Sequence, residues 1–395
     1  MKTYCVGGAV RDRLLGLAVK DRDYVVVGAT PEQMAALGYK PVGKDFPVFL
    51  HPHTRDEYAL ARTERKSGHG YKGFTVYAAP DVTLEQDLAR RDLTINAMAE
   101  DEAGNLIDPY QGQNDLKAGL LRHVSDAFVE DPVRILRAAR FAARYRFTIA
   151  AETMALMQQM VQAGEVDHLV AERVWQEFAK GLMEQMPSIM IRTLRDCGAL
   201  ARVLPEIEAL FSHQSEGEML GEHTLRALDY AASEDWDLPT RFAVLCHDLA
   251  HTASPEQGSD TLIQQLCDRI KAPAEMRELA SLACNEGRQI DAALSLSSEA
   301  LLDLLLRGDA FRRPERFIQL MDSCVAAARG RSGQARSDYP QALLLSACMS
   351  AGKRVDGGAI ARATINSADI PQAIRAARLQ AVITAQQGIL GSASV

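Results

Sequence analysis

The pattern of apolar and polar residues divides the chain into a mixed front part and a helical remainder. In the first third of the sequence, short apolar runs of strand length alternate with short helical patterns. The predicted strands are Thr3–Val6, Tyr24–Val27, Val48–Leu50, Tyr58–Ala61 and Leu106–Ile107. A helix is predicted after Thr30, because Pro31 suits the first helical position and Gln33 completes a capping box.

From Asp131 onward, apolar residues recur only with helical spacing. The predicted helices are Arg134–Tyr145, Ala151–Val161, Glu172–Met183, Ser188–Cys197, Glu222–Ala232, Thr240–Asp248, Thr261–Ile270, Ala274–Cys284, Ser298–Leu306, Pro314–Arg329, Pro340–Ala351 and Pro371–Gly388. The stretch Ala328–Ser337, rich in Arg, Gly and Ser, is predicted to be a loop or hinge. The pattern therefore predicts an α+β chain, with a small mixed-sheet head followed by a long all-α part.

The composition is that of a globular protein, with 47% apolar, 24% charged and 6% aromatic residues. It excludes disordered, collagen-like and fibrous classes, and the length indicates two or more domains. The apolar runs are far too short to span a membrane, and Arg11 and Asp12 interrupt any signal-peptide core. The seven cysteines are scattered and never spaced C-x-x-C, which disfavours a disulfide framework or a zinc ribbon. These features predict a cytoplasmic protein without a membrane segment.

The net charge of −8 disfavours a nucleic-acid partner at first sight. Residues 1–140 are nearly neutral, however, and most of the negative charge lies in the rest of the chain. Clustered arginines in a neutral region can bind polyphosphate or RNA locally. The net charge therefore does not decide the partner.

The densest group of polar residues with chemical potential stands at the start of the chain. Gly7 and Gly8 lie between a strand and a helix, where the backbone can approach a phosphate closely, and Arg11 would add a bidentate clamp. Asp21 and Asp23 are two apart, so on a strand both carboxylates would point to one face. Such a pair repels unless a cation lies between, and Mg²⁺ held by carboxylates and substrate phosphates is the usual solution. An Asp-x-Asp pattern alone is more often a pair of solvated aspartates. The glycine segment upstream favours the interpretation that this pair binds a metal.

A second group is Arg90-Arg91-Asp92, followed by Asn96. Two adjacent arginines at a helix start are equally well explained as surface charge, and Asp92 is predicted to be the N-cap of a short helix. Asn96 stands among apolar residues, and a buried amide needs hydrogen-bond partners.

A third group follows Asp131. Arg134, Arg137 and Arg140 are three apart and share one side of the predicted helix. A solvated face normally mixes both signs of charge, but every charge between Asp131 and Glu152 is arginine. A row of repelling guanidinium groups indicates an anion, and their planar forks suit phosphates or base edges.

In combination, these segments resemble the tRNA nucleotidyltransferase family, the CCA-adding enzymes of the polymerase-beta-like superfamily, and in particular the bacterial class II type that also includes poly(A) polymerases. The likeness covers roughly residues 1–205 and rests on Val6–Asp23, Glu57–Lys66, Arg90–Ala97 and Glu130–Arg140. It implies that the 3′-hydroxyl of a tRNA attacks the α-phosphate of CTP or ATP and releases pyrophosphate, with no nucleic-acid template. It also implies four parts: a nucleotidyltransferase head at 1–125, a helical neck at 126–205, a helical body at 206–330 and a helical tail at 331–395.

The resemblance implies roles for single residues. Asp21 and Asp23 match the catalytic pair that binds the metal, with Mg²⁺ as the expected ion. The positions that hold the incoming nucleotide correspond to Gly8, Arg11, Arg91, Arg137 and Arg140. Asp131 and Arg134 match the pair that reads the base edge, and such a pair accepts C and A while rejecting G and U.

Further segments match supporting parts of the family pattern. Glu172-Arg173 resembles the helical motif that supports the base-reading helix. Arg62-Thr63-Glu64 and the Gly-rich loop Ser67–Gly73 match the mobile segment used in switching from C to A. Either Glu57 or Glu64 is a candidate third catalytic carboxylate.

The helical body raises a separate question. Glu222-His223 and His247-Asp248 resemble the HD phosphohydrolase domain, with His251 one helical turn further on. That metal site needs more histidines downstream, and none of the nine histidines lies after His251. We therefore expect a degenerate HD-like domain in which His247-Asp248 is a satisfied pair in a helical core.

Template-independent CCA addition is the leading functional hypothesis. A poly(A) polymerase, or an enzyme that adds only C or only A, is the nearest alternative. Two alternatives come from other classes: a metal phosphohydrolase acting through the body, which the missing histidines disfavour, and a non-catalytic RNA chaperone, which would not need the Asp21–Asp23 pair. No sequence feature indicates a particular oligomeric state.

Overall fold

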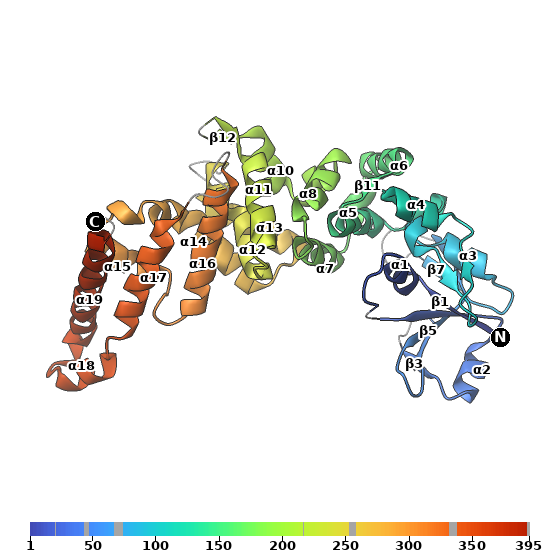
Figure 1. The fold of residues 1–395 in the computed structure, drawn as a ribbon, viewed down its shortest axis with the longest axis horizontal. Helices are drawn as coiled ribbons and strands as arrows, with labels where there is room; N and C mark the ends of the chain where they lie inside the picture. Colours follow the sequence, from blue (N-terminus) through green and yellow to red (C-terminus); the bar gives the residue numbers. More distant parts are fainter. Residues whose placement is uncertain are drawn as a thin grey trace. The chain divides into compact units, whose positions relative to one another are not determined.

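The computed structural model describes residues 1–19, 21–42, 47–66, 74–215, 217–252, 258–331 and 338–392. The chain forms two compact units (Figure 1). The first comprises Met1–Gly181 and Ile189–Val203, and the second comprises Leu182–Ser188 and Leu204–Val395.

A seven-stranded mixed sheet forms the centre of the first unit, in the order β3-β4-β5-β2-β1-β8-β9. Its strands are β1 (Lys2–Val6), β2 (Asp23–Val27), β3 (Lys40–Val42), β4 (Val48–Leu50), β5 (Glu57–Leu60), β8 (Ala99–Glu100) and β9 (Leu106–Ile107). Strand β2 pairs antiparallel with β1 and parallel with β5. Val25 packs into one apolar cluster and Val26 into another, because successive side chains point to opposite faces. Packing on both faces of the sheet therefore fixes the position of β2, the strand that begins with Asp23.

Short helices and helical turns surround this sheet, and longer helices follow it. They are α1 (Gly8–Leu14), α2 (Pro31–Ala36), α3 (Leu84–Ala89), α4 (Gly112–Ala118), α5 (Val133–Tyr145), α6 (Ala151–Gln162), α7 (Ala171–Leu182), α8 (Pro187–Asp196) and α9 (Ala199–Val203), with 3-10 turns η1 (Thr94–Asn96), η2 (Asp126–Glu130) and η3 (Glu165–His168). Two small strand pairs complete the unit: β6 (Thr63–Lys66) with β7 (Phe74–Tyr77), and β10 (Leu120–Leu121) with β11 (Thr148–Ile149).

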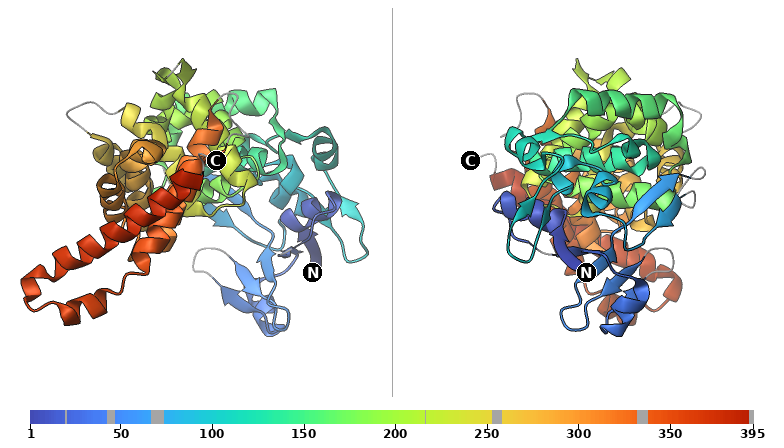
Figure 2. Two further views of the ribbon diagram at one scale, coloured as in Figure 1. Left: turned by 60° about the vertical axis from the view of Figure 1, so that its left-hand side comes forward. Right: turned by 90° about the vertical axis from the view of Figure 1, so that its right-hand side faces the viewer.

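The second unit is almost entirely helical. Its helices are α10 (Pro205–Ala209), α11 (Leu220–Ser233), α12 (Leu238–Cys246), α13 (Gly258–Ile270), α14 (Ala274–Asp291), α15 (Ser298–Arg307), α16 (Pro314–Gly330), α17 (Pro340–Lys353), α18 (Gly357–Ala363) and α19 (Ile370–Ser392). Short turns and one strand pair join them: η4 (Leu210–Ser212), η5 (His247–His251), η6 (Ala293–Ser295), η7 (Ser367–Asp369), β12 (Gln214–Ser215) and β13 (Glu218–Met219). Helices α17 and α19 lie side by side (Figure 2), and Leu344 and Val382 from them join α15 and α16 in one apolar core.

The predicted α+β class is confirmed, and so is the capping box at Thr30. The helix predicted to end at Cys284 instead continues to Asp291, and Ile290 in the added turns is buried in the apolar core of the second unit. Short helices such as α3 and α4 were missed, since they carry too few apolar residues to show a period. The predicted loop Ser67–Gly73 lies outside the described residues. Among the described helices, none is long and apolar enough to cross a membrane.

Candidate nucleotide and metal site

The turn between β1 and α1 brings the first and second sequence groups together. Gly7 has φ +69°, a conformation that favours glycine, and a Cβ at this position would lie 2.8 Å from Nη1 of Arg91. Gly8 begins α1, and Arg11, one turn later, is 4% exposed. The glycine turn therefore allows the Arg91 guanidinium to approach the backbone at the end of β1.

Asp23 lies at the start of β2 and is exposed, with Asp21 two residues before it. The prediction that both aspartates lie on the strand is wrong, because the β1–β2 ladder ends at the Val6–Asp23 pair, where the chain turns at Gly7. The two carboxylates still interact. Desolvation and the nearby Asp21 raise the pKa of Asp23, and only Arg91 opposes this shift.

Two neighbouring carboxylates of this kind fit a divalent cation, which removes their mutual repulsion. Glu57 is the residue of β5 opposite Asp23 in the parallel register, so it lies on the adjacent strand. The side chain of Glu64 lies outside the described part of the structure. Within the described part, no group of three His, Cys, Asp or Glu side chains could hold a metal ion. Asp21 and Asp23 are thus the pair available to a metal that is also held by substrate phosphates.

Arg90 and Arg91 are anchored by Asp87, a fully buried residue of α3 that sequence analysis missed. Its Oδ1 lies 2.8 Å from Arg90 Nη2, and its Oδ2 lies 3.4 Å from Arg91 Nη2. Burial alone would raise the pKa of Asp87, but the two arginines hold it below its ordinary value. Asp87 also accepts a hydrogen bond from the backbone N–H of Arg62. One buried carboxylate therefore orients Arg91 and connects it to the segment at Arg62.

Asp92 is not a helix N-cap, because Leu93 occupies that position before η1. Instead its carboxylate, 7% exposed, accepts hydrogen bonds from Arg137 Nε at 2.8 Å and from the Asn96 amide at 3.0 Å. The side-chain oxygen Oδ1 of Asn96 in turn accepts a hydrogen bond from Arg11 Nη1, so the buried amide has the partners that the sequence analysis required. Burial would raise the pKa of Asp92, but Arg137 and its other partners lower it to about 2.

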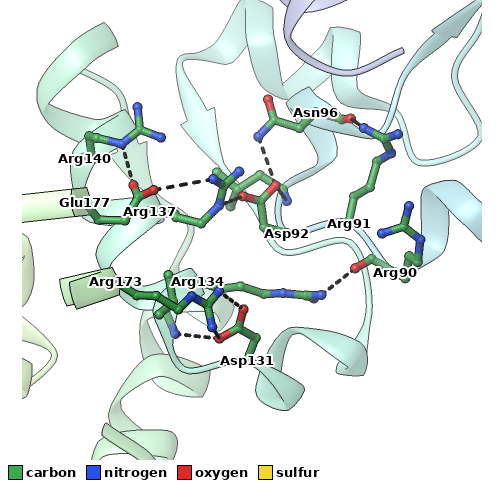
Figure 3. A network of polar contacts seen from close by, with 12 residues as sticks. Arg90, Arg91, Asp92, Asn96, Asp131, Arg134, Arg137, Arg140, Arg173 and Glu177 are labelled. Atoms are coloured by element: carbon green, nitrogen blue, oxygen red, sulfur yellow. Dashed lines mark hydrogen bonds and ion pairs between the residues drawn. The ribbon is translucent and has the colours of Figure 1, made fainter. Parts of the chain in front are cut away.

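The three arginines of α5 also have protein partners (Figure 3). Arg140 Nε lies 2.6 Å from Glu177 of α7, and Arg137 Nη1 lies 3.7 Å from the same carboxylate. Arg134 donates to the backbone carbonyls of Ala127 at 2.9 Å and Arg90 at 2.7 Å. The arginine row therefore does not by itself require an anion, because Asp92 and Glu177 form ion pairs with Arg137 and Arg140. That these arginines hold the nucleotide stays a prediction.

Asp131 and Arg173 form a two-bond ion pair, with contacts of 2.7 and 3.2 Å. This pair joins the start of α5 to α7. Among the predicted nucleotide-binding residues, Arg11, Arg137 and Arg140 therefore belong to one cluster around Asp92 and Glu177. Arg91 pairs with Asp87, Arg134 bonds backbone carbonyls, and Asp131 pairs with Arg173, all within the first unit.

Comparisons with known proteins show which family the chain belongs to. Residues 3–122 match the family described as poly A polymerase head domain, and residues 146–211 match a probable RNA and SrmB-binding site of polymerase A. A curated Multifunctional CCA protein of Chromobacterium violaceum is 57% identical, over 96% of this chain and 97% of its own length. The chain belongs to the CCA-adding family of tRNA nucleotidyltransferases.

Solved structures share the fold of this family member. The CCA-adding enzyme of Bacillus stearothermophilus in complex with CTP has a TM-score of 0.68 and 23% identity, covering 97% of this chain and 89% of that chain. The Thermotoga maritima CCA-adding enzyme complexed with tRNA-CCA has a TM-score of 0.68 and 22% identity, covering 99% and 91% respectively. Polymerase-beta-like nucleotidyltransferases generally use a divalent metal.

Sequence analysis of this CCA-adding family member missed the residues that hold the arginines. Glu177 carries a readable signal, since it lies one helical turn after Arg173 in a predicted helix. Phe141 carries none. It lies on α5 with Arg140, and the guanidinium carbons of Arg140 and of Arg11 on α1 lie 4.5 and 5.1 Å from the centre of its ring. Such contacts hold cationic groups over an apolar surface without neutralising them.

In the second unit, His223, His247 and Asp248 meet as a hydrogen-bonded group. His223 Nδ1 lies 2.6 Å from Asp248 Oδ2, and His247 Nδ1 lies 3.2 Å from Asp248 Oδ1. Burial opposes charge on His223, but the Asp248 carboxylate raises its pKa above the ordinary value. The two histidines hold the pKa of Asp248 far below its usual range despite its burial.

Proposed function

We propose that this chain adds and repairs the 3′-terminal CCA of tRNA without a nucleic-acid template, using CTP and ATP and releasing pyrophosphate. The observation that carries the proposal is the Asp21–Asp23 pair beside Arg91, in a chain that belongs to the CCA-adding family over nearly its whole length. The tRNA 3′ end and the two nucleoside triphosphates are thus its substrates. Reduced cysteines, with all seven free, support a cytoplasmic location.

Asp21 and Asp23 hold the divalent metal in this proposal, and Mg²⁺ fits best because it is bound by a few carboxylates together with substrate phosphates. Bound there, the metal would activate the attacking hydroxyl and stabilise charge on the leaving pyrophosphate. Gly8 allows the backbone to approach a phosphate of the nucleotide closely. The nucleotide is held by Arg11, Arg91, Arg137 and Arg140.

Asp131 and Arg134 read the base edge. Their support is the rigid placement of both side chains: Arg173 fixes the Asp131 carboxylate, and two backbone carbonyls fix the Arg134 guanidinium. A fixed donor and acceptor set leaves polar groups unpaired against the wrong base, which is how a site rejects G and U. In chain order, the proposed parts are a head at 1–125, a helical neck at 126–205 that carries this pair, a body at 206–330 and a tail at 331–395.

Incubation with tRNA that lacks its last three nucleotides tests the function. With labelled nucleotides added singly, CTP is expected to give extension that stops before A, and GTP and UTP no extension. CTP together with ATP is expected to restore the complete end. A homopolymeric A tail from ATP alone would identify a poly(A) polymerase. Extension that stops after C in the mixture of CTP and ATP would identify an enzyme that adds only C.

Substitution of the base-reading pair is expected to separate base choice from chemistry. Asp131→Ala and Arg134→Ala should relax the discrimination against GTP and UTP by about tenfold or more, since each unpaired polar group in the wrong complex costs more than about 1 kcal/mol. Single-nucleotide incorporation rates for all four triphosphates measure this. A variant that loses rate for every nucleotide but keeps its C and A preference would show that these side chains bind phosphate instead.

The body is expected to show little or no metal-dependent phosphodiesterase or phosphatase activity. A two-metal hydrolytic site needs enough ligands for both ions and an open position for water. Among the described residues, no group of three His, Cys, Asp or Glu side chains is placed so that it could hold a metal ion. Hydrolysis of 2′,3′-cyclic nucleotides that depends on nickel, cobalt or manganese, and is abolished by His247→Ala, would contradict this and favour the phosphohydrolase alternative.

A further inference from the structure

Asp12 follows Arg11 on α1, and its carboxylate contacts the C-terminal turn of α5. Its Oδ1 accepts a hydrogen bond from the Tyr145 hydroxyl at 2.9 Å, and its Oδ2 lies 3.5 Å from Nη2 of Arg144. Tyr145 is the last residue of α5, 133 positions further along the chain. Burial raises the pKa of Tyr145 to about 12, so the hydroxyl keeps the proton that it donates. The C-terminal turn of α5 therefore anchors a carboxylate of α1.

The same carboxylate oxygen holds the guanidinium of Arg11. Nε of Arg11 donates to Asp12 Oδ1 at 2.8 Å, and Nη2 of Arg11 lies 2.7 Å from that atom. Adjacent positions on a helix point about 100° apart, so their side chains do not normally face each other. A contact between them needs an anchor outside the helix. Tyr145 and Arg144 provide this anchor for Asp12.

Aromatic rings of α5 also surround the Arg11 guanidinium, which is only 4% exposed. Its central carbon lies 5.1 Å from the centre of the Phe141 ring and 5.1 Å from that of Tyr145. The two rings are stacked, with their planes 10° apart. Contacts of this kind attract a guanidinium without neutralising it. Arg11 is therefore held in one place with its charge still available to a ligand.

Arg11 keeps N–H groups for such a ligand. A guanidinium has five N–H donors, and here Nε donates to Asp12 and Nη1 to Asn96. Among the described residues these are its only hydrogen bonds, so donors remain at both terminal nitrogens. A Cβ on Gly8 would lie 3.4 Å from Nη2, which places this end of Arg11 beside the glycine turn. Two neighbouring N–H groups suit two oxygens of one phosphate.

We propose that Tyr145 and Asp12 are positioning residues for nucleotide binding. Tyr145 holds the Asp12 carboxylate, and this carboxylate fixes Arg11 so that its remaining N–H groups face a phosphate at the glycine turn. The inference rests on the proposed function, in which Arg11 holds the nucleotide. Helix α5 thereby acts at both ends, with Arg134 reading the base in its first turn and Tyr145 orienting a phosphate-binding arginine from its last.

Steady-state kinetics of Tyr145→Phe with CTP and ATP on shortened tRNA tests the proposal. The substitution removes only the hydroxyl and keeps the ring beside Arg11. KM for both nucleotides is expected to rise about fivefold, with kcat changed less than about twofold, because a phosphate contact acts equally in the ground state and the transition state. Tyr110→Phe is the matched control, since its hydroxyl donates to the backbone carbonyl of Glu85 at 3.1 Å in the same unit. It should change neither constant.

A double-mutant cycle with Arg11→Lys shows whether the hydroxyl acts through Arg11. Lysine keeps the charge but lacks the planar fork that Asp12 holds. CTP affinity, measured by titration calorimetry, is expected to fall about fivefold for Tyr145→Phe in the natural chain. In the Arg11→Lys background the same substitution should cost less than about twofold, since the group that it positions is already gone.

Three outcomes would overturn the proposal: an unchanged KM in Tyr145→Phe, an equal rise of KM in Tyr110→Phe, or the same loss of CTP affinity in both Arg11 backgrounds. Addition of C and A by the natural chain is the separate reference for the proposed function. If the natural chain extends the tRNA and Tyr145→Phe matches its KM, only the positioning role fails. If the natural chain gives no extension but the calorimetric cycle is non-additive, only the proposed function fails.

Discussion

Asp21→Asn and Asp23→Asn are each expected to reduce nucleotide addition by several powers of ten. The amide has nearly the shape of the carboxylate but lacks its charge, so the substitution replaces an anionic metal ligand with a weaker neutral one. A metal contributes several kcal/mol of transition-state stabilisation, and each ~1.4 kcal/mol is a factor of about ten in rate. Both aspartates are exposed, so the variants should fold. Single-turnover addition of C to a shortened tRNA measures the loss.

Two further variants make this test specific. Glu102→Gln removes an exposed carboxylate in a turn of the same unit and should leave the rate unchanged. Glu57→Gln tests the neighbour of Asp23 on β5: a loss as large as that of the aspartates would identify Glu57 as a third catalytic carboxylate. Near-normal C and A addition by Asp21→Asn would refute the metal assignment.

Asp92→Asn is expected to weaken both stability and nucleotide binding. Asp92 is buried against Arg137, so the substitution leaves a guanidinium without its closest carboxylate. The pKa of Asp92 is about 2 in the folded chain against 3.8 as the ordinary value, a difference worth about 2 kcal/mol. A depressed carboxyl pKa stabilises the fold above about pH 4, and this contribution is lost as the pH falls toward 2. The difference in the free energy of unfolding between the variant and the natural chain should therefore be largest near pH 7 and shrink on acidification. Urea unfolding at several pH values measures it.

The kinetic part of the prediction separates a specific role from general destabilisation. Because Arg137 is a proposed nucleotide-binding residue, Asp92→Asn should raise KM for both CTP and ATP, by about tenfold. Asp115→Asn is the matched control: Asp115 is equally buried and bonded to Thr94 and Arg122, but it has no contact with the α5 arginines in the described structure. It should lose stability with little change in KM. Equal KM changes in both variants would show that Asp92 has only a structural role.

Much of the head could be predicted from the sequence because its signals are local. An apolar run such as Tyr24–Val27 specifies a strand, and Thr30, Pro31 and Gln33 specify a helix start through contacts within a few residues. The family motifs likewise lie in short contiguous segments. The fold class and the candidate residues therefore followed from sequence alone.

The tertiary structure decided how those residues are held. Arg137 meets Asp92 across 45 residues and Arg140 meets Glu177 across 37, so no local pattern shows that the arginine row has protein partners. A still longer separation in sequence hid the contact between His223 Nε2 and the backbone carbonyl of Ala327, 104 residues away. Charge pairing and burial depend on which elements meet in space. The sequence by itself determined which chemical groups are present and which short segments carry them, and only the fold decided which of their atoms are already bonded, because long-range contacts leave no periodic signal along the chain.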